Sequence, residues 1–314
     1  MSFEFLRDGQ VWLYDSSNYY RLHVSRDVSF SQTFQREEKQ NRTLHSLNNL
    51  FSGSIFREAN PANFSFVLYL ISDGGSSAAH QHKPLDYLLQ YNGNLLNTFD
   101  LFFVYPDYSP QVYYKIKDCV FTNGSFRVEK AKILSVELSG EGSQLTRIEG
   151  SFPGTDANYI NSVSIATSKE VLAEVEGNTL DNILGVSLEV QNNIEWTKNS
   201  TLQNSLSVTN ETNTVYPSNF TLSNRSVSGS ISQYVNSSVS TSNNNIQTWT
   251  NDTTIRIASG IATNNLQFDF NVNLGSPNGT CSFTNRVNTS DVFTQNYDFT
   301  LTSNPTNLKQ YFTY

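Results

Sequence analysis

A faint internal repeat relates the two halves of this amino-acid sequence. The segment Asn60–Phe66 (NPANFSF) resembles Tyr216–Leu222 (YPSNFTL) at a separation of 156 positions (217 minus 61). Upstream, Val28-Ser29-Phe30 resembles Val186-Ser187-Leu188 at a separation of 158 positions (186 minus 28). Two copies of this length are too few and too long for a solenoid. The repeat therefore predicts two tandem domains of ordinary size.

Two weaker matches follow in the same order along the chain. Phe99-Asp100-Leu101 resembles Phe268-Asp269-Phe270, and the segment 135–145 resembles 298–308, with Leu138 aligned to Leu301. Gly and Pro residues interrupt the chain where the first copy ends. We therefore place the domains at residues 1–150 and 151–314, with a linker at about residues 149–157.

The composition and the local pattern both indicate a mainly β protein. Charged residues make up only 15% of the chain and aromatic residues 13%, which argues against disorder. Short runs rich in β-branched and aromatic residues alternate with turn residues and predict strands. These runs lie at residues 11–14, 20–24, 64–71, 101–105, 112–116 and 133–138. After the last run, we interpret Gly140-Glu141-Gly142 as a turn.

One helix is predicted at residues 83–91, since Pro84 stands near its first position and Asn92-Gly93 follows its end. Three leucines, Leu85, Leu88 and Leu89, would form its buried stripe. A weaker counterpart at residues 245–249 predicts a helix in the second copy.

The span from Arg36 to Asn60 is a polar, charged connection that is long for a compact domain. It has two interpretations, a hairpin arm that touches a partner and a solvated loop. Under the first interpretation, charged and apolar side chains of the span are the candidate assembly residues: Arg36, Glu37, Glu38, Lys39, Arg42, Phe51 and Phe56.

The charge of the chain argues against tight nucleic-acid binding. The formal net charge is −8, and the acidic excess lies before residue 197, since acidic and basic residues balance beyond it. Nucleic-acid binding draws its affinity from Lys and Arg side chains that neutralise phosphates. The sequence also contains no apolar run as long as a membrane span and no secretory signal. We therefore expect synthesis in the cytoplasm and no membrane partner.

Motifs for catalysis or cofactor binding are missing from the sequence. No nucleophile elbow, phosphate-binding glycine loop or zinc spacing occurs. His80 and His82 could share a metal with a carboxylate such as Asp86, but isolated histidines far outnumber metal ligands. Cys119 and Cys281 are predicted to be buried free thiols. We expect no cofactor and no resident metal, and catalysis is the weaker class of function.

The short strands, the single helix, the long loop after the second strand and the ending Leu134–Gly142 (LSVELSGEG) resemble the tail tube domain of long-tailed bacteriophages. The same domain is seen in the type VI secretion tube. The repeat resembles the tandem form of some non-contractile tails, in which one chain carries two tube domains. The resemblance implies two β-sandwich or open-barrel domains, each with one flanking α-helix. One departure is Thr302-Ser303-Asn304-Pro305, which stands where the first copy has Ser139–Gly142.

The resemblance also implies a structural subunit of a tail tube, located in the virion tail after assembly in the host cytoplasm. In such tubes six domains surround a lumen, and their sheets join into an inner barrel with the helices outside. Three tandem chains would therefore form a trimeric ring with pseudo-sixfold symmetry. Rings would stack through the arm at residues 36–60, and DNA would pass through the channel without specific binding. Implied partners are further copies of the chain and tail proteins such as the tape measure and the terminator.

Two other functions fit the same composition. A carbohydrate-binding or adhesin β-sandwich would also be rich in aromatic residues and in Asn and Thr. A distal tail protein or a tail terminator ring protein would share the tube domain but occur in fewer copies.

Overall fold

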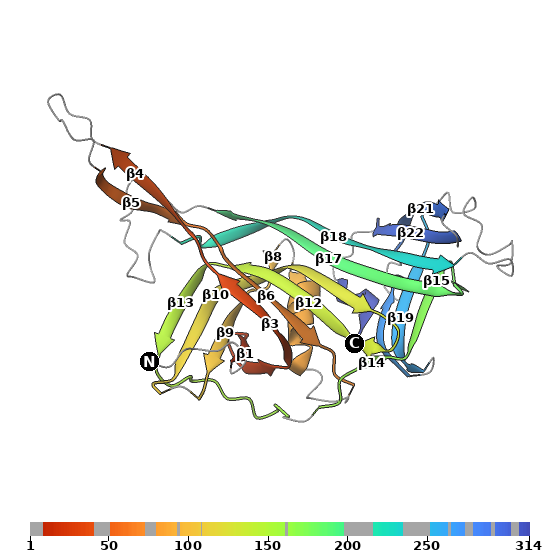
Figure 1. The fold of residues 1–314 in the computed structure, drawn as a ribbon, viewed down its shortest axis with the longest axis horizontal. Helices are drawn as coiled ribbons and strands as arrows, with labels where there is room; N and C mark the ends of the chain where they lie inside the picture. The colour runs from red at the N-terminus through yellow and green to blue at the C-terminus, as the bar shows by residue number, and fades with distance from the viewer. Residues whose placement is uncertain are drawn as a thin grey trace.

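The computed structural model describes residues 9–40, 51–72, 80–92, 95–107, 109–160, 163–197, 216–234, 252–262, 265–273, 279–289, 293–302 and 308–314. Within these ranges the protein is mainly β, which confirms the predicted fold class (Figure 1). Every predicted strand run overlaps an observed strand, although the run at residues 112–116 is only the start of a much longer one.

The described part of the first half contains fourteen elements. They are β1 (Gln10–Tyr14), β2 (Tyr19–Leu22), β3 (Val24–Ser31), β4 (Phe34–Gln40), β5 (Phe51–Ala59), β6 (Ala62–Tyr69), α2 (Lys83–Leu89), β7 (Tyr91–Asn92), β8 (Leu95–Leu96), β9 (Phe99–Tyr105), β10 (Val112–Val128), β11 (Lys132–Ile133), β12 (Ser135–Gly142) and β13 (Gln144–Glu149).

The second half contains further strands and a short 3-10 helix. They are β14 (Thr167–Ser168), β15 (Glu170–Val175), β16 (Asn178–Thr179), β17 (Ile183–Thr197), β18 (Asn219–Tyr234), β19 (Ile255–Ala262), β20 (Asn265–Asn271), β21 (Cys281–Thr289), β22 (Phe293–Leu301), η2 (Leu308–Tyr311) and β23 (Phe312–Thr313). The second-copy helix predicted at residues 245–249 lies outside the described residues.

One antiparallel sheet, which we call the long sheet, runs through both halves in the order β3-β6-β12-β10-β17-β18-β22-β21. The two halves meet where β10 pairs with β17, with Phe126 opposite Leu188. Figure 1 shows β17 and β18 continuing across the top of the molecule from one half to the other. The halves are therefore joined by continuous backbone hydrogen bonding.

A second layer of strands packs beneath each half of the long sheet. Under the first half the order is β2-β1-β9-β10-β13, and under the second it is β16-β15-β19-β20-β23. β10 belongs to both layers, because its register shifts between Ile116 and Cys119. At this bend Asp118 has a φ of 52°, and its backbone N–H donates to Asp100 Oδ1 at 3.1 Å. The bulge redirects one strand from the second layer into the long sheet.

The four strands from each half pair in the same order, β3-β6-β12-β10 and β17-β18-β22-β21. The hydroxyls of Ser29 and Ser65 lie 2.8 Å apart across β3 and β6, and those of Ser187 and Ser230 lie 2.8 Å apart across β17 and β18. Ser29 thus corresponds to Ser187, as the sequence match at a separation of 158 positions (187 minus 29) predicted. The division into domains at residues 1–150 and 151–314 stays a prediction.

The other sequence matches do not align corresponding positions of the two pairing patterns. Ser65 corresponds to Ser230 at a separation of 165 positions (230 minus 65), so the 156-position match is wrong as a structural alignment. The two separations differ because β18 is one continuous strand, whereas the corresponding part of the first half is divided into β5 and β6. The segment Phe99-Asp100-Leu101 lies on β9, whose counterpart in pairing order is β19. The segment that it resembles, Phe268-Asp269-Phe270, lies on β20 instead. β22 ends at Leu301, so the segment 298–308 is not the counterpart of β12.

A single hydrophobic cluster fills the space between the layers and extends through both halves. The helix α2 packs into it with Leu85, Leu88 and Leu89 fully buried, which confirms the predicted stripe. Cys119 and Cys281 are buried free thiols in the same cluster, also as predicted. The predicted linker is not a free tether, because Phe152 packs in a smaller cluster with Trp12, Phe102 and Tyr113.

Segments from the second half hold α2 in place. Asn192 and Arg225 donate to the carbonyl oxygen of Leu88 at 3.2 and 3.0 Å, and Arg225 also donates to that of Leu89. These carbonyls belong to the last turn of the helix, where backbone carbonyls have no N–H partner within the helix. On the same helix, Asp86 accepts hydrogen bonds from Lys309 Nζ and the Tyr314 hydroxyl at 2.6 and 2.9 Å. α2 therefore anchors both the second half of the long sheet and the end of the described chain.

The interpretation of Gly140-Glu141-Gly142 as a turn is wrong, since these residues are the end of β12. Gly140 lies opposite Phe64, and a Cβ added there would lie 2.4 Å from the Phe64 ring and 2.3 Å from the Val120 carbonyl oxygen. Only glycine fits at position 140, because the Phe64 ring packs directly over the strand there. The second half repeats the arrangement with the strands exchanged, because Gly229 of β18 lies under Phe299 of β22.

Substitution of Gly229 by alanine is expected to destabilise the fold. The new Cβ would lie 2.2 Å from the Ser187 carbonyl oxygen and 2.5 Å from the Phe299 ring. We expect a loss of about 2 kcal/mol or more in the free energy of unfolding, measured by chemical denaturation. Gly185→Ala is the matched control, because no atom lies within 4 Å of its added Cβ. Equal stability of the two variants would contradict the packing argument.

Candidate functional site

Within the span from Arg36 to Asn60, the described strands β4 and β5 pair with each other and project away from the two layers (Figure 1). β4 and β5 pair antiparallel, with Phe34 opposite Ala59 at the base and Gln40 opposite Phe51 at the far end of the described part. We call β4 and β5 the arm. Six candidate residues lie on it, but their side chains are outside the described part of the structure, as is Arg42: Arg36, Glu37, Glu38, Lys39, Phe51 and Phe56. Contact of the arm with a partner stays a prediction.

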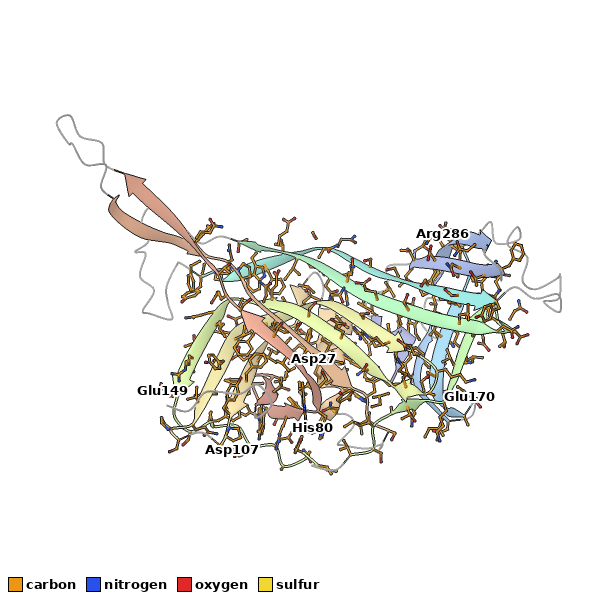
Figure 2. The ribbon with its side chains drawn as sticks, in the orientation of Figure 1. Asp27, His80, Asp107, Glu149, Glu170 and Arg286 are labelled. Carbon is orange, nitrogen blue, oxygen red and sulfur yellow. The ribbon has the colours of Figure 1, made fainter. Side chains whose placement is uncertain are left out.

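The long sheet has one face buried in the core and one polar face. Because successive side chains of a strand point to opposite sides, Ser29, Ser65 and Ser187 lie opposite the buried Phe66 and Leu188. We define the polar face by the residues Asp27, Ser29, Ser65, Glu137, Ser139, Glu141, Asn123, Arg127, Ser187, Glu189, Ser230, Ser232, Asn296, Asp298 and Arg286. Figure 2 shows Asp27 of β3 and Arg286 of β21, which belong to the two outermost strands of this sheet.

Cross-strand polar contacts follow one another across the polar face. Besides the two serine pairs, the Ser232 hydroxyl donates to Asn296 Oδ1 at 2.7 Å between β18 and β22. Charged or amide groups also link β10 to β12 through Arg127 with Glu137, β10 to β17 through Asn123 with Glu189, and β21 to β22 through Arg286 with Asp298. Such pairs each contribute a fraction of a kcal/mol, and these contacts are all made between side chains of the face itself.

The electrostatics of the polar face are neutral to acidic. Hydroxyl and amide groups dominate it, and the carboxylates of Asp27, Glu137, Glu141, Glu189 and Asp298 outnumber its guanidinium groups. Glu141 accepts a hydrogen bond from the Trp196 indole N–H at 2.9 Å, and burial raises the pKa of its carboxyl. The exposed pairs of Arg127 and Arg286 add little stability. The described part of this face has no basic stripe that would hold phosphates.

Sequence reasoning did not single out the polar face. Its signal is present in Arg225–Ser232 (RSVSGSIS) and in Ser135–Gly142 (SVELSGEG), where small polar residues alternate with apolar ones. The alternation predicts a strand with one polar side but not which neighbours align with it. Only the register brings Ser187 beside Ser230 and Ser29 beside Ser65.

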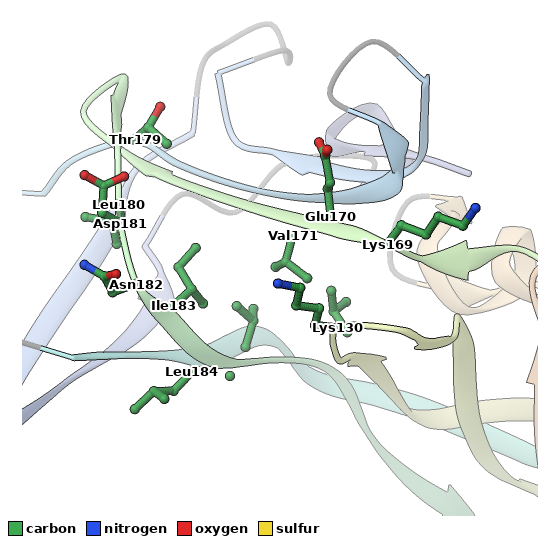
Figure 3. Close-up of a pocket in the computed structure, with 13 residues that line it drawn as sticks. Lys130, Lys169, Glu170, Val171, Thr179, Leu180, Asp181, Asn182, Ile183 and Leu184 are labelled. Carbon is green, nitrogen blue, oxygen red and sulfur yellow. The ribbon is translucent and has the colours of Figure 1, made fainter.

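The end of the long sheet away from the arm exposes large apolar side chains. Leu184 of β17, Tyr234 of β18 and Phe293 of β22 are 46%, 44% and 53% exposed, and Ile133 beside β12 is 45% exposed. We call these four residues the apolar rim. Next to Leu184, a hollow of about 430 Å³ opens between β15, β16 and β17, with Lys130, Lys169 and Asp181 in its wall (Figure 3). The molecule thus carries the arm at one end of the sheet and the apolar rim at the other.

The two histidines considered as metal ligands take part in packing and hydrogen bonding. His82 is 4% exposed, and its Nε2 accepts a hydrogen bond from the Ile71 backbone N–H at 3.2 Å. The Tyr314 ring meets it edge-on at 5.4 Å. His80 Nε2 lies 3.1 Å from the Asn158 amide. Among the described residues, no group of three or more His, Cys, Asp or Glu side chains is placed to hold a metal ion.

Protonation of His82 is expected to destabilise the protein in mild acid. Burial lowers the pKa of its imidazole from 6.5 to about 4, with the nearby Asp86 opposing the shift. The unfolded chain therefore binds the proton first, and stability falls as the pH drops from about 6.5 towards 4, by on the order of 3 kcal/mol for this group. Thermal denaturation across this range should show a shallower pH dependence for His82→Gln. An unchanged dependence in the variant would contradict the assignment.

A comparison with models of known protein families gives a match over nearly the whole chain. The family model described as the Bacteriophage Baseplate Tube Protein Family matches residues 1–313. Comparison with curated proteins gives no match. No helix in the described ranges is both long enough and apolar enough to cross a membrane.

Proposed function

The chain belongs to the bacteriophage baseplate tube protein family, a family of structural virion components, and from this premise we propose that it forms rings around a channel for DNA. The observation that carries the proposal is the long sheet. Its core face is covered by the second layer and α2, whereas its polar face is continuous across both halves. A sheet of this kind can serve as one sector of a barrel wall.

The pairing order supports a ring of three chains. Each half contributes four strands to the long sheet, and the junction of β10 with β17 joins them without a gap. A tube ring built from six such four-stranded parts would need three chains. We therefore propose a trimeric ring with pseudo-sixfold symmetry, in which the two halves act as tandem tube domains. Closure into a barrel would also remove the exposed sheet edges.

The polar face would line the channel, and α2 would lie on the outer side. Hydroxyl and amide groups with an acidic excess repel rather than retain phosphates, so DNA would slide past without specific binding. The contacts among Ser29, Ser65, Ser187 and Ser230 keep these groups engaged with each other. The role proposed for the chain is structural and not enzymatic.

Stacking of the rings would use the arm and the apolar rim. The two lie at opposite ends of the long sheet, so contact between them is heterologous and does not close on itself. Repetition of such a contact produces a tube. Its partners would be further copies of the chain and adjoining tail proteins, such as the tape measure or the terminator. The family description favours a place in the baseplate over the main tube of a long non-contractile tail, and copy number per virion separates the two.

The ring proposal is tested on the purified full-length chain. Native mass spectrometry should detect trimers, and negative-stain microscopy should show rings or short tubes with a central channel. The fraction assembled should rise with protein concentration, because edge pairing between chains is an association equilibrium. A chain that stays monomeric at all concentrations would contradict the proposal, and a closed hexamer would overturn the trimeric arrangement.

Removal of the arm should leave rings but prevent their stacking. Gln35 and Glu58 are opposite each other at its base, so a two-residue turn can replace residues 36–57 without disturbing β3 or β6. Microscopy of this variant should show single rings where the full chain gives stacks. Phe293→Ser at the apolar rim should weaken stacking in the same way, because it removes exposed apolar area. Undiminished stacks in the arm deletion would exclude a role for the arm.

A further inference from the structure

We infer that β21 of one chain pairs with β3 of the next chain, in the register that β10 and β17 use within a chain. The inference rests on the proposed ring and assigns residue partners to its subunit contact. β3 and β21 are the two outermost strands of the long sheet, and in the described part of the structure each pairs with only one other strand of that sheet, β6 and β22 respectively. Unpaired edges are templates for strands of another chain.

The correspondence of β3 with β17 follows from the serine pairs. Ser29 and Ser187 occupy the same position relative to their hydroxyl partners Ser65 and Ser230. Residues of β17 therefore map onto β3 by subtracting 158 positions (187 minus 29).

The correspondence of β21 with β10 is found by following the register from Ser65 and Ser230 across the next two strands of each half. Ser65 is opposite Ser139 of β12, and Ser230 is opposite Asp298 of β22. One strand further, Ser139 is opposite Asn123 of β10. Likewise, Asp298 is opposite Thr284 of β21. Residues of β10 therefore map onto β21 by adding 161 positions (284 minus 123).

Applying both mappings to the β10–β17 junction gives the residue pairs expected between β21 of one chain and β3 of the next. Within the chain, Arg127 lies opposite Ser187, and Ser125 lies opposite Glu189. Their counterparts between chains are Asn288 of β21 opposite Ser29 of β3, and Arg286 opposite Ser31.

Burial provides a check that the mapping did not use. Ser29, Ser31, Arg286 and Asn288 are all exposed, so the register pairs exposed positions with exposed positions. A shift of one residue would place Asn288 opposite Phe30, whose ring stacks on Phe103 at 4.2 Å beneath the sheet. Such a shift would put the polar face of one chain against the core face of the next.

The edge at β3 is also incompletely covered. Val28 and Phe30 are only half-buried, whereas their counterparts Val186 and Leu188 at the internal junction are 8% and 0% exposed. A hollow of about 100 Å³ opens beside Val28, with Val11 in its wall. A neighbouring strand would cover this apolar seam as β10 covers the corresponding part of β17. Burial of this kind is favourable by roughly 25 cal/mol per Å² of apolar area.

Paired cysteines test the register in the assembled full-length protein. Ser29→Cys combined with Asn288→Cys should form disulfides between chains on mild oxidation, giving dimers and covalent trimers on a non-reducing gel. Arg127→Cys combined with Ser187→Cys is the positive control, since the same geometry lies within one chain and should give a disulfide without added mass. Cys119 and Cys281 can remain, because both are buried.

A displaced pair on the same two strands is the negative control. Ser29→Cys with Ser282→Cys keeps both positions exposed but moves one by six residues, about 20 Å along the strand. It should link at least about tenfold less than the register pair. Equal linking of both pairs, or rings in which neither pair links, would overturn the inferred register while leaving the ring proposal standing. Absence of any ring or oligomer would overturn both.

Discussion

The pairing of β10 with β17 is the contact on which the rest of the structure depends. It joins the last strand of one four-stranded part to the first strand of the other, with Phe126 beside Leu188 on the core face and Arg127 beside Ser187 on the polar face. One hydrophobic cluster and one polar face can run through the whole chain only because this junction is continuous. A flexible connection between the halves would leave both the cluster and the face interrupted.

The helix α2 makes the junction stiff. Its leucines fill the cluster beneath β10, while Arg225 and Asn192 hold its last carbonyls and Lys309 and Tyr314 hold Asp86. Motion of one half relative to the other would break several of these contacts together. A ring subunit with two pseudo-equivalent parts needs such stiffness, since a variable angle between the parts would prevent closure at a fixed number of chains.

Local pattern was sufficient to predict what is decided locally. The β class, the helix with its buried leucines, the two buried thiols and an unusually long connection after Arg36 could all be read from the sequence, although the sequence left open whether that connection is a hairpin or a loop. Long-range register could not, because a strand with alternating residues pairs equally well in several positions until its neighbours are known. The polar face was missed for this reason. The glycines of β12 were misread as a turn because the ring of Phe64, which requires Gly140, lies on another strand.

The same constraint explains why the repeat is so faint in the sequence. In the first half a phenylalanine on β6 covers a glycine on β12, and in the second half Gly229 on β18 is covered by Phe299 on β22. Each half keeps one glycine facing one phenylalanine, but the two residues exchange strands. Close packing constrains the summed volume of the two facing side chains and not the volume of each one. Comparison of one strand with its counterpart therefore finds glycine against phenylalanine. The match of Ser29 with Ser187 remains recognisable because each residue must be small and polar for its hydroxyl to lie 2.8 Å from the serine hydroxyl opposite.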